Sequence, residues 1–164
     1  MTSTYPQQPV TQLALVMIAI GFAGACPAQT TDKSVPMPTV SDVWVKPTIP
    51  GGSVSAAYMQ IKSATPVKLV KAESSVAGIV EIHDMKMNHG VMEMKALETV
   101  DVEPGKVVRL APGGMHVMLM KVKNPIRKGD KVRLTLTFED VRKKQIVVKL
   151  DATARENFAD DHQH

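Results

Sequence analysis

The sequence predicts an all-β domain, a sandwich or a barrel, from three features of the residues beyond position 38. Short runs in which apolar and polar residues alternate recur every 8 to 12 residues, as in strands that bury one face. Turns rich in proline and glycine separate these runs, as at residues 47–52. After the apolar run near the N-terminus, no long segment has the 3.6-residue apolar period of an amphipathic helix.

Each expected strand rests on its own alternation. In residues 131–138, every second side chain is apolar, which assigns one face to the core. The turn Asn88-His89-Gly90 joins two runs into a hairpin. In chain order, we expect strands at residues 40–46, 54–62, 67–72, 77–87, 91–96, 107–111, 116–123, 131–138 and 145–150.

Composition narrows the function classes. Of the 164 residues, 44% are hydrophobic, which is enough to pack the core of one domain. The net charge of +4 is spread over turns and outward strand positions, and aromatic residues make up only 4%. A nucleic-acid interface normally combines a basic patch with stacking aromatics, so we expect no nucleic-acid partner.

The N-terminus predicts export to the periplasm. The apolar run at residues 13–25 is too short to span a bilayer comfortably, and small residues at 23–28 follow it, as in a secretory signal peptide. Cys26 is the only cysteine, so no disulfide can form within the chain. We expect cleavage after Ala28 rather than lipid anchoring at Cys26, because Ala23 replaces the leucine that usually opens a lipobox.

The predicted organisation has four parts. They are a signal peptide at 1–28, a flexible mature N-terminus at 29–38, a β-sandwich domain at 39–153, and a polar tail at 154–164 that contains His162 and His164.

Methionine and histidine are concentrated in one stretch, residues 83–120, which holds seven of the eleven methionines and three of the five histidines. Thioether and imidazole groups are preferred ligands of soft or borderline metals, above all Cu(I). Glu81 shares a strand face with His83 and Met85, so we expect this face to point outward. By the same alternation, Val117 and Leu119 point inward and His116, Met118 and Met120 point outward.

The hairpin turn predicts how the two sets could meet. It pairs Met87 with Met92 and Met85 with Met94, which places His83 diagonal to Met94. If the strand at 116–120 approaches this hairpin, four side chains can converge on one exposed surface: His83, Met94, His116 and Met118. Methionine is also a common packing residue, and Met92, Met115 and Met120 are better explained as packing or surface filler. His89 lies in a tight turn, which favours a structural role.

The spacing of these four residues matches a known signature. The order His83, ten residues, Met94, twenty-one residues, His116, one residue, Met118 is that of the His-x10-Met-x21-His-x-Met motif of the periplasmic PCu(A)C copper chaperones. The chain resembles that family over residues 38–152. Further shared features are Trp44, the Pro-Gly-Gly loop before residues 56–59, Glu81-Ile82-His83, Gly90-Val91-Met92, Pro112-Gly113-Gly114 and Gly129-Asp130.

The resemblance implies a cupredoxin-like Greek-key β-sandwich and an exposed Cu(I) site at the four motif residues. It also implies a copper chaperone that delivers its ion towards the CuA site of cytochrome c oxidase, alongside a Sco-type thiol protein. We expect the protein to be a monomer. Met85, His89, His162 and His164 are candidates for an auxiliary metal site, where Cu(II) could bind.

Two other functions stay open. The additional methionines and histidines could serve copper storage or detoxification, with more than one ion bound. Alternatively, the domain is a metal-free interaction module whose Met-rich face docks a partner. We expect no enzyme and no small-molecule substrate, since the sequence offers no paired carboxylates for acid–base work, no activated nucleophile and no phosphate loop.

Overall fold

The computed structural model describes residues 36–156, and every regular element in this range is a β-strand. In this part of the chain, no helix is long and apolar enough to cross a membrane. The expected signal peptide, Cys26, His162 and His164 lie outside the described residues. The strands are β1 (Thr39–Val45), β2 (Val54–Lys62), β3 (Val67–Ser74), β4 (Ala77–Asn88), β5 (Val91–Leu97), β6 (Val100–Val102), β7 (Val107–Leu110), β8 (His116–Val122), β9 (Lys131–Asp140) and β10 (Gln145–Ala154).

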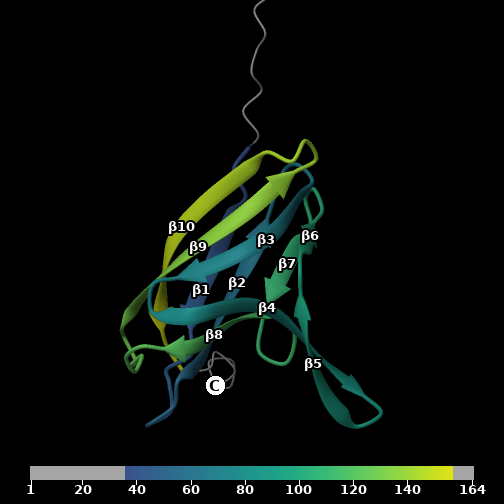
Figure 1. Ribbon diagram of the computed structural model, residues 1–164. Helices are drawn as coiled ribbons and strands as arrows, with labels where there is room; N and C mark the ends of the chain where they lie inside the picture. Colours follow the sequence, from purple (N-terminus) through teal and green to yellow (C-terminus); the bar gives the residue numbers. More distant parts are fainter. Residues whose placement is uncertain (1–35, 157–164) are drawn as a thin grey trace, which may run out of the picture. The chain divides into compact units, whose positions relative to one another are not determined.

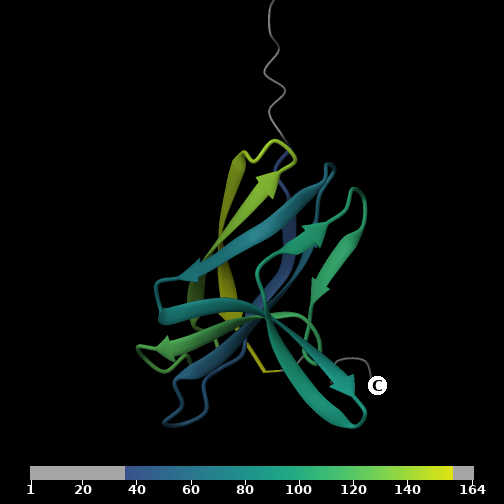
Figure 2. The same cartoon turned by 45° about the vertical axis from the view of Figure 1, so that its right-hand side comes forward.

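The strands form one continuous, strongly curved path in the order β5-β4-β8-β2-β1-β10-β9-β3-β6, and β7 pairs with β2. All neighbouring strands pair antiparallel except β1 and β10, which are parallel. Figures 1 and 2 show β3, β9 and β10 on one side of the domain and β2, β4 and β8 on the other. The predicted all-β sandwich is therefore confirmed. The short strand β6 was not expected, because three residues are too few to show an alternation.

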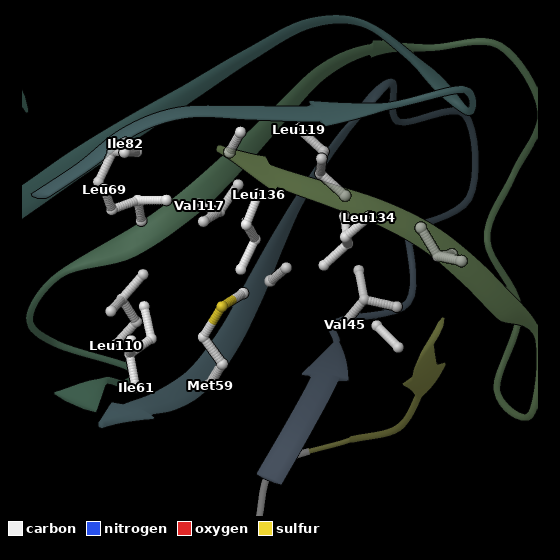
Figure 3. Close-up of a cluster of buried hydrophobic side chains, with 14 of the residues drawn as sticks. Val45, Met59, Ile61, Leu69, Ile82, Leu110, Val117, Leu119, Leu134 and Leu136 are labelled. Carbon is white, nitrogen blue, oxygen red and sulfur yellow. The ribbon is translucent and has the colours of Figure 1, made fainter. Parts of the chain in front are cut away.

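The core lies between these two groups of strands, and the alternating side chains of β9 form its centre. Leu134, Leu136 and Phe138 have no exposed surface. Figure 3 shows Leu134 and Leu136 near Met59 of β2 and Val117 and Leu119 of β8. Burying side chains of this size is worth about 1.5–3 kcal/mol each, so the core fixes which face of every strand points inward.

The β4–β5 hairpin follows the predicted register. Its loop has two residues, His89 and Gly90, with φ of 49° and 81°, which is the geometry of a type I′ turn. Met85 pairs with Met94 and Met87 with Met92, as predicted. In Figures 1 and 2 the end of this hairpin extends away from the other strands. The exposed side chains Met87 and Met92 lie near its tip.

Asp140 organises the turn between β9 and β10, on the layer away from this hairpin. Its Oδ1 accepts hydrogen bonds from the backbone N–H groups of Arg142 and Lys144, both at 2.8 Å. The Arg142 guanidinium lies 3.4 Å from Oδ2. The Lys144 backbone bond is the first cause that holds the pKa of the Asp140 carboxyl below its ordinary value, and the bonds and charge of Arg142 add to it.

We predict that Asp140→Asn lowers the free energy of unfolding at neutral pH, because the variant keeps a neutral acceptor but loses the charge. A carboxyl with a depressed folded pKa stabilises the fold above its unfolded pKa of about 3.9, and this stabilisation is lost as the pH falls. The difference between parent and variant should therefore narrow below about pH 4 in urea unfolding.

The matched control is Asp101→Asn, which removes an exposed ion pair with Lys68 and should change little. A difference between parent and D140N that stays constant from neutral to acid pH would contradict the assignment.

Candidate metal centre

The two histidines of the proposed motif are direct neighbours across two strands. His83 of β4 is paired with His116 of β8 in the antiparallel register. Their ring centroids are 5.9 Å apart and the rings are inclined by 64°. The approach of β8 to the hairpin, which the sequence could only state as a condition, is therefore present.

His116 is held in a defined orientation. Its Nδ1 lies 2.9 Å from the carbonyl oxygen of Gly114. A carbonyl only accepts, so Nδ1 carries the proton and donates, and the lone pair of the neutral ring remains on Nε2. A ligating histidine is commonly oriented in this way, by a hydrogen bond from its other nitrogen.

The structure corrects one expectation about this residue, because His116 is 4% exposed rather than on an open surface. An aromatic pair lies beside it. The ring of Tyr58 on β2 lies 6.3 Å from the imidazole, and Trp44 on β1 lies 4.4 Å from Tyr58. Burial raises the pKa of the Tyr58 hydroxyl. Alternation predicted the correct face of β8, but it could not show that neighbouring strands cover this face with large side chains.

His83 lies at the border between buried and exposed, with 12% of its side chain accessible. Its Nε2 is 2.8 Å from Oε2 of Glu81, two residues earlier on the same face of β4. Its Nδ1 is buried and has no hydrogen-bond partner among the described residues. The expected outward direction of this face is correct for Glu81, which is exposed, and only in part for His83.

The strand registers place two thioethers on the same face as the imidazoles. Met118 of β8 is paired with Glu81 and is partly buried. Met94 of β5 is diagonal to His83, because His83 is paired with Ala96, and it is 48% exposed. The four motif side chains thus belong to one face of β5, β4 and β8, with His116 at the covered end and Met94 at the open end.

This donor set fits a soft monovalent ion. Cu(I) accepts three or four soft ligands without strict geometry, and imidazole and thioether are among them. Among residues 36–156, no group of three or more His, Cys, Asp or Glu side chains could hold a metal ion. The thioethers of Met94 and Met118 are soft donors that share the face of the paired histidines.

The other methionines and His89 have different surroundings. Met115 packs against the core, in agreement with the role expected for it. Met92 is 61% exposed on the hairpin, and Met120 is partly buried opposite Ile79. Of the auxiliary candidates, Met85 lies opposite Met94, and His89 is exposed at the turn. A positive φ at His89 agrees with a structural role in the turn.

Sequence reasoning missed three contacts around the histidines. They are the Glu81 carboxylate on His83, the Gly114 carbonyl on His116, and the Tyr58 ring beside His116. The contact between Glu81 and His83 could have been predicted from the sequence, because residues i and i+2 of a strand share a face and the Glu-x-His spacing therefore places both side chains together. The other two depend on a loop conformation and on strand pairing.

Comparison of the sequence with known proteins finds a family and two relatives of this chain. The family model described as "Putative lipoprotein LpqE-like" matches residues 38–150. The putative lipoprotein Lxx21020 of Leifsonia xyli is 32% identical over 167 residues, which cover 96% of this chain and 99% of that protein. The uncharacterized protein RP573 of Rickettsia prowazekii is 30% identical over 113 residues, which cover 65% of this chain and 62% of that protein.

Solved structures of other proteins share the fold of this domain. The apo PCuAC domain from PmoF1 is 25% identical with a TM-score of 0.58, over 76% of this chain and 98% of that domain. Apo-DR1885 from Deinococcus radiodurans is 28% identical with a TM-score of 0.56, over 96% and 98%. CuI-DR1885 from the same organism is 27% identical with a TM-score of 0.52, over 80% and 87%. The chain therefore belongs to the LpqE-like family, and its domain is a PCuAC domain.

Proposed function

We propose that this protein is a periplasmic carrier that binds one Cu(I) ion through His83, Met94, His116 and Met118 and passes it on by ligand exchange. The observation that carries the proposal is the pairing of His83 with His116 across β4 and β8. Met94 and Met118 lie at neighbouring positions on the same face of these strands and of β5. DR1885, 27% identical to this chain, has a solution structure with CuI, which supports copper as the cargo.

The choice of Cu(I) follows from the donors. Zinc prefers thiolate, imidazole and carboxylate, and a blue-copper electron-transfer site needs a cysteine thiolate. Residues 36–156 contain no cysteine. Two imidazoles with two thioethers satisfy Cu(I), and neither group needs a reducing environment to stay available for the ion, as a free thiol does.

The position of the donors supports transfer. His116 is buried and hydrogen-bonded, while Met94 is half-exposed on β5, the strand at the end of the strand order. A ligand of an acceptor protein can thus replace Met94 before the ion leaves the histidines. We propose the CuA site of cytochrome c oxidase and a Sco-type thiol protein as acceptors, on the strength of the family resemblance.

Copper storage is the second candidate, and the hairpin favours it. Met87 and Met92 are paired and exposed near the tip, next to His89. These side chains offer further soft donors outside the four-residue set. A carrier needs one tight site, whereas a storage protein needs several of similar strength.

We predict one tight equivalent in an anaerobic Cu(I) titration against a chromophoric chelator. Met94→Ala should weaken binding by more than the roughly 10- to 100-fold loss typical of an outer-shell partner, because it removes a donor atom. Met92→Ala is the matched control, since it lies two residues away on the same strand face and is also exposed. Equal loss in both variants, or several equivalents in the parent, would favour storage, and no binding would favour a metal-free interaction module.

We also predict that Cu(I) changes the emission of Trp44, the only tryptophan. Trp44 packs on Tyr58, and Tyr58 lies beside His116. A fluorescence titration should therefore break at one equivalent, and the break should be absent in His116→Ala. An unchanged emission despite tight binding measured with the chelator would place the ion elsewhere.

Export and processing remain a proposal with a direct test. We expect the mature chain to begin after Ala28, so its mass should show neither Cys26 nor a lipid. The relative from Leifsonia xyli bears the name of a putative lipoprotein, and processing of that kind would leave a lipid-modified Cys26 at the mature N-terminus. Mass spectrometry of the protein recovered from cells distinguishes the two products.

A further inference from the structure

The hydrogen bond between His83 and Glu81 determines which nitrogen of His83 can bind an ion. Nε2 and Oε2 are 2.8 Å apart. An ionised carboxylate only accepts, so Nε2 carries the proton and donates. The lone pair of the neutral ring is then on Nδ1, which is buried and has no partner among the described residues. A buried nitrogen without a partner is unfavourable, and a bound cation would satisfy it.

His116 has the opposite arrangement. Its Nδ1 donates to the Gly114 carbonyl, which leaves the lone pair on Nε2. The two paired histidines therefore have their lone pairs on different ring nitrogens. The side chain of Glu81 selects Nδ1 of His83, and the backbone carbonyl of Gly114 selects Nε2 of His116. A backbone carbonyl cannot be removed by substitution, whereas the carboxylate of Glu81 can, and this makes the role of Glu81 testable.

We propose that Glu81 is a positioning residue, which holds His83 as the tautomer that offers Nδ1 to Cu(I). The inference rests on the proposed function and deepens it by assigning Nδ1 of His83 and Nε2 of His116 as the donor atoms. A carboxylate on the outer nitrogen also restrains the orientation of the ring. Its negative charge, beside His83 and opposite Met118, compensates the charge of the incoming ion.

Glu81 acts through His83 in this arrangement and not as a ligand. Its Oε2 is engaged by the imidazole, and its side chain is 47% exposed, whereas only 12% of the His83 side chain is accessible. A hard carboxylate oxygen is also a poorer donor for Cu(I) than the thioether of Met118 in the neighbouring strand position.

The test uses Glu81→Ala, Glu81→Gln and a matched control, Glu73→Gln. Glu73 is a 50% exposed glutamate on β3 with a partner, Lys71, at 2.7 Å, so it matches Glu81 in exposure and pairing. Long-range 1H–15N spectra of the imidazoles, recorded on the metal-free and the Cu(I)-loaded protein at about pH 8, above the usual histidine pKa, report the tautomer and the nitrogen that binds. Chelator competition gives the affinity.

In the parent and in E73Q, we expect the Nε2–H tautomer of His83 and a shift of its Nδ1 resonance on addition of Cu(I). E81A should show a mixture of tautomers and a loss of affinity of about 10- to 100-fold. E81Q should lie between the two, because its carbonyl still accepts the hydrogen bond without the charge.

Three results would overturn the positioning role: an unchanged tautomer in E81A, an unchanged affinity in E81A, or a Cu(I) shift on Nε2 of His83 in the parent. The failure of the proposed function looks different. A parent that shows the expected tautomer but does not bind Cu(I) would remove both the carrier and the positioning role, while tight binding by the parent with unaffected Glu81 variants would remove only the latter.

Discussion

The candidate site depends on the register of β8. Val117 and Leu119 have no exposed surface, and their burial turns His116 and Met118 to the opposite face, where pairing with β4 sets them beside His83 and Glu81. A slip of one residue would exchange the two faces and replace the imidazole by valine. The hydrophobic core therefore fixes the positions of the candidate donors, although none of them belongs to it.

The same face combines a covered end and an open end. Trp44 and Tyr58 lie beside His116, and the Gly114 carbonyl fixes the orientation of its ring. Met94 belongs to the outer strand of the hairpin and is half-exposed. A buried, hydrogen-bonded imidazole together with an accessible thioether would suit the proposed transfer, since preorganised donors give affinity while an accessible donor permits exchange.

Family and site rest on different observations. The LpqE-like model and the PCuAC domains of known structure show the family and the fold. The proposal of four donor residues instead rests on this chain's own spacing and strand registers, together with the ring orientations of His83 and His116. Variants of single residues are therefore the decisive tests, and the exposed Met92 and Glu73 provide controls that resemble the tested residues in exposure and setting.

The alternation of side chains in the sequence determined the strands, the inward face of β8 and the hairpin register of Met85 with Met94, because each of these follows from neighbours along the chain. Only the tertiary structure decided that His116 is buried, since Tyr58 comes from a strand distant in sequence. It also decided which nitrogen of each histidine is free, because ring orientation depends on hydrogen bonds to Glu81 and Gly114. The local sequence pattern determines which face of a strand a side chain occupies. The burial of the side chain and the orientation of its ring depend on contacts with other strands and loops.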